Sequence, residues 1–265
     1  MKKLQLKTIF ITSFHILVGR NLLFTDTLKI LAAKGVRIII LVPNYKKGYF
    51  EKSLRQEGVV IEGVAAYGFS KKFAGLFFKR LARPILRTHT SNIRTRQKLF
   101  LEKKVFYYFF FLLPARFLGR FALIIRLARW LDFSLAPDKN FFKGLFERYR
   151  PDLVIAADIN NENDVALLQD AKRNHIPTLG WVRSWDGPTN FLVRAVPDRI
   201  AVWNDTLKSE LITFQQIKPG AISVVGIPHY DRYLRGPTLS REDFFRKLGA
   251  DLSKKLILYV PVKTR

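Results

Sequence analysis

Cysteine is absent from the 265-residue sequence, which excludes disulfide bonds and cysteine-ligated metal centres. A reducing compartment such as the cytoplasm is compatible with this absence. The four histidines are scattered along the chain, so a zinc site is not expected either. No GxGxxG fingerprint follows the first predicted strand, and nothing therefore points to a dinucleotide. We expect neither a metal nor a cofactor.

Acidic residues are scarce: 21 Asp and Glu stand against 46 Lys and Arg, which gives a formal charge of +25. This charge favours a polyanionic partner, and three classes stay open: nucleic acid, an acidic membrane surface, or a phosphate-bearing substrate. No recognisable nucleic-acid-binding motif accompanies the basic residues, so nucleic acid is the least favoured of the three.

Long hydrophobic runs are also missing, since a membrane-spanning helix needs about 20 apolar residues. The most apolar stretch, VFYYFFFLLPA at 105–115, is roughly half that length, and Arg116 and Arg120 follow at once. The start of the chain, MKKLQLKTIFITSF, has a basic end but lacks the small-residue cleavage site of a signal peptide. We interpret it as the first strand.

The rest of the chain alternates short Val/Ile-rich runs with amphipathic segments of about a dozen residues. This order predicts an α/β fold: a Rossmann-like, doubly wound parallel sheet with helices on both faces. The predicted strands are 8–14, 36–43, 59–64, 151–158, 177–182, 199–203 and 221–226, and the predicted helices are 22–35, 48–58, 161–175 and 204–216.

Between residues 71 and 150 this alternation stops. The segment holds 19 Lys and Arg, 4 Asp and Glu, and 14 of the 23 Phe, so it carries +15 of the total +25. In FLGRFALIIRLARWL, the residues Arg120, Arg126 and Arg129 have spacings that a helix sorts into two faces. We predict a basic helical insertion. Either its Phe side chains face the domain core, or it binds an anionic membrane surface.

The chain ends on REDFFRKLGAD, a predicted helix, and KKLILYVPVKTR, a predicted central-type strand. A strand of this kind with no crossover helix after it indicates that a second α/β domain is beginning. We therefore expect a first domain over 1–235, with the insertion at 71–150, and the start of a truncated second domain over 236–265.

Four short motifs occur in order: VRSWDGPTN, VPDRIAVWNDTLKSEL, ISVVGIPHYDRY and KKLILYVP. Together they resemble the junction region of GT-B-type transferases of bacterial surface carbohydrate biosynthesis. Relatives of these enzymes include the CDP-glycerol glycerophosphotransferases and the UDP-N-acetylglucosamine 2-epimerase-like proteins. The resemblance covers about residues 150–262 and leaves out the basic segment.

The resemblance implies two Rossmann-like domains facing each other across a cleft, the first holding the acceptor and the second, here incomplete, the nucleotide-activated donor. The implied reaction moves a sugar or glycerophosphate unit to a cell-surface polysaccharide or lipid-linked acceptor, at the cytoplasmic face of the membrane. The fragment alone is expected to be inactive. A UDP-sugar 2-epimerase-like enzyme and a non-catalytic basic nucleic-acid-binding domain are the alternatives.

The turn after the strand that ends in GWV is rich in functional side chains: Arg183, Ser184, Trp185 and Asp186. Ligands of open α/β sheets bind beyond the carboxyl ends of strands, so this turn is expected to border the cleft. Arg183 suits a phosphate, Trp185 suits stacking on a sugar or lipid, and Asp186 suits proton transfer. Alternatively, Trp185 packs under the loop and Asp186 caps backbone N–H groups.

The first strand is followed by SFHILVGRN. His15 lies where some GT-B enzymes place a catalytic base, so the resemblance makes it a candidate to deprotonate an acceptor hydroxyl. Gly19, Arg20 and Asn21 are expected to precede a helix whose N-terminus favours an anion, with simple helix entry as the alternative.

Two further groups are substrate-binding candidates. Asp158, at the end of VIAAD, either contacts a ligand or supports the next helix, for which Asn160 or Asn161 is the expected N-cap. His229, in the predicted interdomain linker GIPHYDRY, either faces the cleft or ties the linker down.

Overall fold

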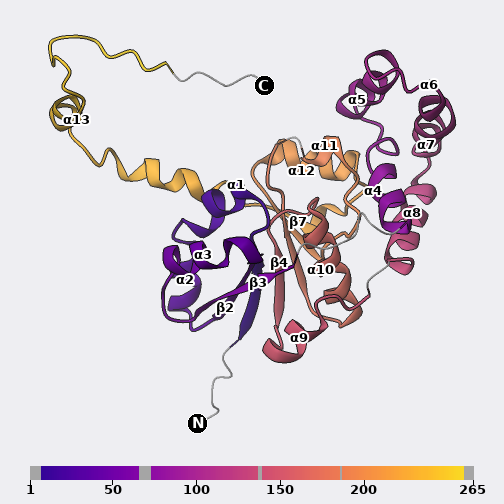
Figure 1. Ribbon diagram of the computed structural model, residues 1–265, viewed down its shortest axis with the longest axis horizontal. Helices are drawn as coiled ribbons and strands as arrows, with labels where there is room; N and C mark the ends of the chain where they lie inside the picture. Colours follow the sequence, from indigo (N-terminus) through magenta and orange to yellow (C-terminus); the bar gives the residue numbers. More distant parts are fainter. Residues whose placement is uncertain (1–6, 66–72, 137–138, 186, 260–265) are drawn as a thin grey trace. The chain divides into compact units, whose positions relative to one another are not determined.

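The computed structural model describes residues 7–65, 73–136, 139–185 and 187–259 (Figure 1). Contacts between residues divide the chain into two compact units, Met1–His229 and Tyr230–Arg265. The first unit contains the sheet and the helical insertion, and the second contains the helix at 241–248.

A seven-stranded, all-parallel sheet forms the centre of the first unit, in the order β3-β2-β1-β4-β5-β6-β7. The predicted α/β class and all seven predicted strands of this sheet are confirmed. The strands are β1 (Thr8–Thr12), β2 (Arg37–Pro43), β3 (Val59–Val64), β4 (Leu153–Ala156), β5 (Thr178–Trp181), β6 (Arg199–Val202) and β7 (Ile222–Val224).

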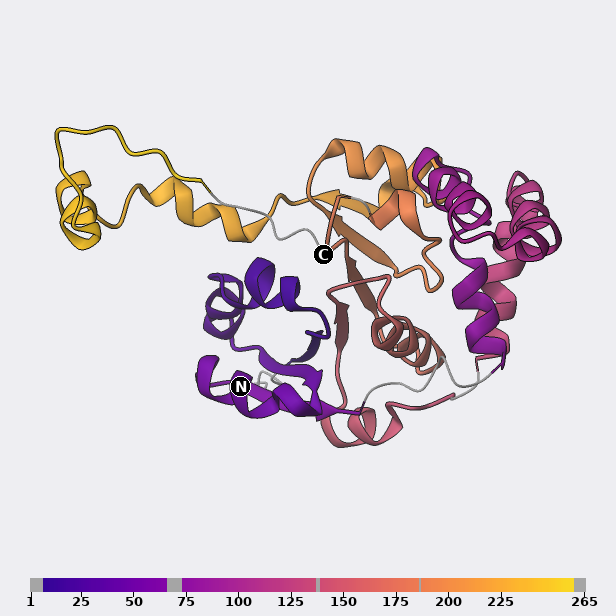
Figure 2. The same cartoon turned by 45° about the horizontal axis from the view of Figure 1, so that its top comes forward.

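Both faces of the sheet are covered because side chains alternate along each strand. In β1, Ile9 and Ile11 pack on one face and Phe10 packs on the other. The first face is covered by α1 (Ile16–Val18), η1 (Gly19–Leu23), α2 (Thr27–Ala33) and α3 (Lys47–Ser53), and the second by α9 (Lys143–Tyr149), α10 (Glu162–Arg173) and α12 (Asp205–Thr213). Figure 2 shows these two layers, and the sheet is doubly wound as predicted.

The first crossover differs from the prediction. The helix expected at 22–35 begins earlier, at Ile16, runs through the π-helical turn η1, and is interrupted before α2. His15 caps its start, although histidine is not among the residues that typically cap helices. The predicted stop is confirmed, because Gly35 has a φ of 71°, which a residue with a Cβ adopts only at a cost. Short 3₁₀ turns η2 (Asn44–Lys46) and η5 (Pro219–Ala221) follow β2 and precede β7.

The basic segment is helical, as predicted, and projects from one side of the sheet (Figures 1 and 2). The helices of its projecting part are α4 (Phe73–Leu81), α5 (His89–Phe100), α6 (Val105–Tyr107), η4 (Tyr108–Leu112), α7 (Leu113–Leu118) and α8 (Ala122–Ser134), whereas α9, at its end, packs on the sheet. Within the described ranges, no single helix is long and apolar enough to span a membrane. The continuous helix Val105–Leu118 and α8 meet that criterion only as a pair, bent by 111°.

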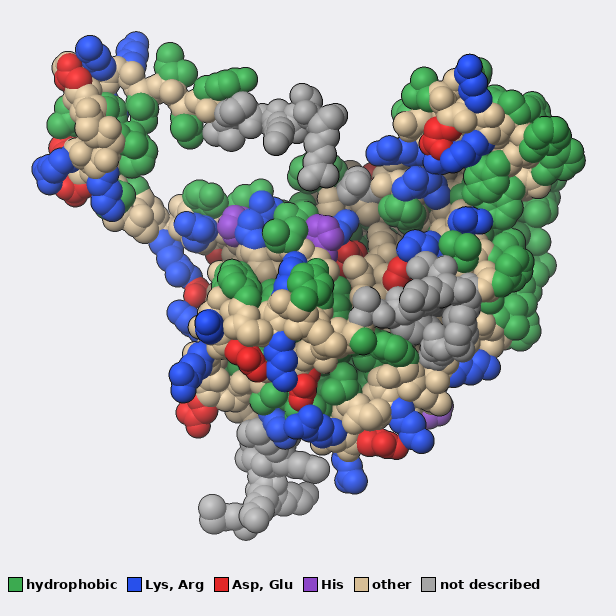
Figure 3. Space-filling view, viewed as in Figure 1, with side chains coloured by type: hydrophobic (Ala, Val, Ile, Leu, Met, Phe, Trp, Pro, Cys, Tyr) green, Lys and Arg blue, Asp and Glu red, His purple; other side chains and the backbone are tan. Residues whose placement is uncertain are grey.

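Many aromatic side chains of the insertion stay outside the core. We define the aromatic face as a set of exposed residues on two consecutive helical segments, of which Phe106 and Phe110 are 81% and 78% exposed. Its members are Phe106, Phe109, Phe110, Phe117, Phe121 and Trp130. Hydrophobic side chains cover the outer side of the insertion in Figure 3. For these residues, the interpretation that the Phe side chains face the domain core is wrong.

The second unit is small. The turn η6 (Pro228–Arg235) crosses its boundary, and α13 (Arg241–Leu248) forms as predicted, capped by Ser240 and ended by Gly249 with a φ of 65°. The strand predicted at 254–265 is not formed over its described part, 254–259. A strand needs a hydrogen-bonded neighbour, and the described residues of this unit include no other strand.

Candidate functional site

The order of the strands reverses between β1 and β4, and in doubly wound sheets ligands bind beyond the carboxyl ends of strands at such a switch point. Residues that follow four neighbouring strands interact here. They are His15 after β1, Lys46 after β2, Asp158 after β4 and Arg183 after β5. The sheet register thus brings together two regions that are more than 160 positions apart in sequence.

Arg183 and Asp158 form an ion pair, with 3.0 Å between the guanidinium Nη1 and the carboxylate Oδ2. Asp158 is buried, and its Oδ1 accepts a hydrogen bond from the Asn160 backbone N–H at 3.3 Å. The Nε of Arg183 is also buried and has no hydrogen-bond partner among the described residues. The carboxylate of Asp158 therefore positions Arg183, whose guanidinium keeps an unused donor for a ligand.

His15 is half-buried beside this pair. Its Nδ1 accepts a hydrogen bond from the Leu17 backbone N–H at 3.2 Å, so the neutral ring carries its proton on Nε2 in this arrangement. Burial lowers the pKa of His15, and the positive charges of Arg183 and then Lys46 lower it further. The ring is consequently neutral at pH 7, the protonation state that a general base requires.

Replacing Arg183 by Gln is expected to raise the pKa of His15 toward its ordinary value of 6.5, because the nearest cationic contribution is removed. Lys46→Gln is expected to raise it by less. Following the His15 ring signals by NMR as a function of pH measures both shifts on the isolated chain. An unchanged His15 pKa in Arg183→Gln would show that the charge of Arg183 does not act on His15.

A buried acid, Asp164, lies next to Asp158 and joins the elements that carry the site. Asp164, in the first turn of α10, is completely buried and accepts a hydrogen bond from the Thr12 hydroxyl at the end of β1. The same hydroxyl oxygen accepts from the Ala157 backbone N–H at 2.8 Å, so β1, β4 and α10 are joined. Desolvation, and then the neighbouring Asp158 carboxylate, raise the pKa of Asp164 well above its ordinary value.

Asp164→Asn is expected to increase the free energy of unfolding at pH 7 by roughly 1–3 kcal/mol, since an amide avoids the cost of a buried acid. The folded protein binds the Asp164 proton more tightly than the unfolded chain does. The stabilisation is therefore present at low pH and is lost as pH rises through the folded-state pKa. Urea unfolding between pH 5 and 8 tests this. The free energy of unfolding should fall more steeply with rising pH in the wild type than in Asp164→Asn, and equal slopes for the two proteins would contradict the assignment.

Two tryptophans lie at the neighbouring strand ends. Trp185 is 72% exposed, and its ring meets that of Trp203, which follows β6, edge-to-face at a centroid distance of 6.2 Å. The alternative that Trp185 packs under its loop is therefore wrong. An exposed indole held by a second one is a suitable stacking surface for a sugar or a base.

Gly19, Arg20 and Asn21 do not precede a helix, as the sequence predicted, but lie within η1. The prediction that they surround a helix N-terminus is wrong because the helix starts at His15. Arg20 is exposed and donates from Nε to the Asn21 Oδ1 at 3.0 Å. Asn21 is buried, and Gly19 packs closely on the Phe24 ring. Arg20 is thus the member of this trio that faces solvent.

The remaining candidates stay predictions. Ser184 is half-buried, and its backbone oxygen accepts from the Gly187 N–H, which begins the short helix α11 (Gly187–Asn190). Asp186 lies outside the described residues. His229 is half-buried at the end of the first unit. Asn161 is the N-cap of α10, as expected, and its side chain accepts from the Asn163 N–H.

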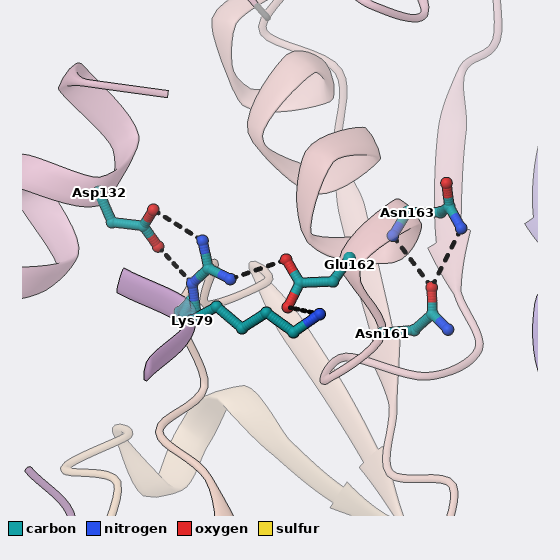
Figure 4. A network of polar contacts seen from close by, with 6 residues as sticks. Lys79, Asp132, Asn161, Glu162 and Asn163 are labelled. Atoms are coloured by element: carbon teal, nitrogen blue, oxygen red, sulfur yellow. Dashed lines mark hydrogen bonds and ion pairs between the residues drawn. The ribbon is translucent and has the colours of Figure 1, made fainter. Parts of the chain in front are cut away.

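A charged network next to this site, shown in Figure 4, escaped the sequence reasoning. Asp132 of α8 accepts two hydrogen bonds from the buried Arg194 guanidinium, at 2.7 and 2.9 Å. Arg194 also donates to Glu162 at the start of α10, and Lys79 of α4 lies 3.8 Å from the same carboxylate. The network fastens the insertion to the carboxyl-end side of the sheet.

No family model matches the chain, and no curated protein matches it. Among solved structures, the chain is similar to the crystal structure of a glycosyltransferase from Rickettsia africae ESF-5, with 11% identity and a TM-score of 0.48. The match covers 93% of this chain and 50% of that one, so this chain spans about half the length of its neighbour. Similarity at this level says nothing about what the chain binds.

Proposed function

We propose that this chain is the acceptor-binding half of a transferase that moves a sugar or glycerophosphate unit from a nucleotide-activated donor to a phosphate-bearing or lipid-linked acceptor. A second α/β domain would supply most of the donor site. The observation that carries the proposal is the neutral His15 held beside the Arg183–Asp158 pair at the switch point of a doubly wound sheet.

In this reaction the acceptor hydroxyl gives its proton to His15 while its oxygen forms the new bond to the donor carbon or phosphorus. The bond to the nucleotide phosphate breaks, and the nucleotide leaves with the electron pair. His15 Nε2 receives the proton only if Nδ1 carries the ring proton, so acceptor binding has to displace the Leu17 N–H from Nδ1. Arg183 offers its free Nε to an acceptor or leaving phosphate, and Trp185 stacks on the transferred group.

The insertion indicates where in the cell the protein is bound. Its exposed aromatic face and its net charge of +15 are the combination that binds an anionic membrane surface, where each basic residue contributes about 1 kcal/mol. We therefore propose peripheral attachment at the cytoplasmic face of the membrane. Single-stranded nucleic acid also combines stacking with cations, but rings exposed on the outer side of the insertion suit a lipid surface better than a strand that needs a groove.

Incubating radiolabelled nucleotide-activated sugars and CDP-glycerol with membrane lipid extract tests the proposed function. The chain alone is expected to transfer nothing, because the proposal places most of the donor site in a second α/β domain. A polypeptide in which such a domain is joined to this chain is expected to label the lipid fraction. Interconversion of a free nucleotide sugar without lipid labelling would instead favour the epimerase alternative.

A further inference from the structure

A second candidate site lies inside the helical insertion. A cavity of about 480 Å³ is lined by six basic side chains, together with Tyr107, Thr95 and apolar groups. The basic residues come from two helices and the segments that follow them: Lys79, Arg80, Arg83, Arg94, Lys98 and Lys104. We call this the basic cavity. Neither the strand-end residues nor the reaction proposed above makes use of it.

Half of these charges lack a counter-ion. Lys98 and Lys104 share the Glu102 carboxylate, and Lys79 pairs with Glu162. Within the described ranges no carboxylate lies at ion-pair distance from the other three, Arg80, Arg83 and Arg94. Six cations around one cavity repel one another unless an anion is bound between them.

Arg83 is the most constrained of the three. Its guanidinium lies over the Phe191 ring, 4.4 Å from the centroid, and its Nε is buried without a hydrogen-bond acceptor among the described residues. Burial, and then the charge of Arg94, lower the pKa of Arg83. A buried donor without an acceptor is costly, so the side chain is held ready for a ligand oxygen.

The basic cavity adjoins the strand-end site. A neighbouring cavity of about 220 Å³ shares Lys79 and Phe191 with it and extends to Asn160 and Asn161 after β4. Asn160 and Asn161 belong to the loop after β4 that also carries Asp158. The basic cavity therefore shares lining residues with a cavity that borders this loop.

The helix Val105–Leu118 has two different faces. Tyr107 and Leu112 line the basic cavity, whereas Phe106, Phe110 and Phe117 belong to the aromatic face on the opposite side. In Figure 3 the hydrophobic side chains cover the outer side of the insertion, and Lys and Arg gather on the side nearer the sheet. The same helix therefore carries a phosphate-binding side and a side suited to a membrane surface.

We propose that the basic cavity binds the terminal phosphate of a membrane lipid, and that this phosphate belongs to the acceptor. Recognition rests on a dianionic phosphate, which offers more acceptor oxygens to Arg83 and Arg94 than a phosphodiester headgroup does. The identity of the lipid as an acceptor rests on the proposed function, whereas the cavity's preference for a phosphomonoester does not.

Flotation of the isolated chain with phosphatidylcholine vesicles tests this. Two vesicle sets carry either phosphatidic acid, a phosphomonoester, or phosphatidylserine, adjusted to equal surface charge. Wild type is expected to bind the phosphatidic acid set about tenfold more tightly. The double variant Arg83→Gln/Arg94→Gln is expected to lose that preference, and its binding to phosphatidylserine is expected to fall no further than that of a variant lacking two other basic residues of the insertion.

Two further variants keep the result interpretable. Arg96→Gln/Arg126→Gln removes the same charge from exposed positions of the insertion outside the cavity lining, and it should keep the preference. Arg80→Gln/Arg94→Gln touches only exposed side chains, so its loss of preference cannot come from misfolding. An equal loss of the preference for phosphatidic acid in the cavity variants and in Arg96→Gln/Arg126→Gln would overturn the proposal.

Titration with inorganic pyrophosphate tests whether the ligand of the basic cavity is a membrane lipid or a soluble phosphate compound. Calorimetric titration into wild type without vesicles is expected to give binding weaker than that to phosphatidic acid vesicles. Tight pyrophosphate binding with no gain from vesicles would overturn the lipid assignment. The chain could select phosphatidic acid through the cavity while a polypeptide that also carries the proposed donor domain transfers nothing to lipid. That result would overturn the proposed function but leave the cavity assigned.

Discussion

Replacing His15 by Asn in a polypeptide that also carries the proposed donor domain is expected to reduce the transfer rate by about 10²–10⁴, the usual contribution of a general base. Asn is chosen because its side-chain oxygen takes over the cap of α1, where the His15 Nδ1 now accepts from the Leu17 N–H. The variant therefore loses the basic nitrogen and keeps the local fold. Turnover per folded molecule, measured with saturating donor, gives the effect.

His89→Asn provides the matched control. His89 is exposed at the start of α5, outside the proposed site, and its replacement should leave both rate and melting temperature unchanged. The wild-type rate is expected to rise with pH and to level off above the lowered pKa of His15, because only the neutral ring accepts a proton. Full activity in His15→Asn would remove the base from the account.

Asp132→Ala is expected to lower the free energy of unfolding by about 3–5 kcal/mol. The Arg194 guanidinium is buried, and two of its three hydrogen bonds in the network go to Asp132. Removing this carboxylate takes two hydrogen bonds from a buried charge, while the bond to Glu162 remains. Amides of α8 should exchange faster with solvent, because the network holds that helix against the sheet.

Two further variants test whether the loss of stability in Asp132→Ala comes from the buried ion pair. Glu147→Ala, at an exposed pair with Lys143, should change stability by less than about 1 kcal/mol. The double variant Asp132→Leu/Arg194→Met should recover most of the loss, since apolar groups of similar size replace buried ion pairs at little cost. Denaturant unfolding decides the matter: a loss in Asp132→Ala no larger than in Glu147→Ala would make the network unimportant for stability.

The central fold was predictable because its signals are local and repeated. Val/Ile-rich runs such as RIIILVP need two covered faces, and each is followed by a segment of helical period. The early helix start at Ile16 was missed because His15 is an unusual N-cap. The last strand was wrongly predicted because pairing depends on a neighbour, which the local pattern of 254–259 does not reveal.

The candidate site was predictable only in part. His15, Asp158 and Arg183 were proposed because they directly follow strands, and parallel strands bring such positions to one edge; their functional roles stay predictions. Asp164 was missed because an acid in the first turn of a helix is ordinarily an exposed partner of the helix dipole. Whether a Phe of the insertion faces the core or solvent is set by packing between distant helices, and no local pattern specifies it.

The lipid-linked glycans of the source organism give the most direct test of the account. Mass spectrometry would compare the wild-type strain, a strain without this coding sequence, and deletion strains restored with the wild-type gene or with His15→Asn. The account predicts that the deletion and His15→Asn strains accumulate a lipid-linked acceptor one sugar or glycerophosphate unit short, at equal protein levels. Unaltered glycolipids in the deletion strain, or full restoration by His15→Asn, would contradict it.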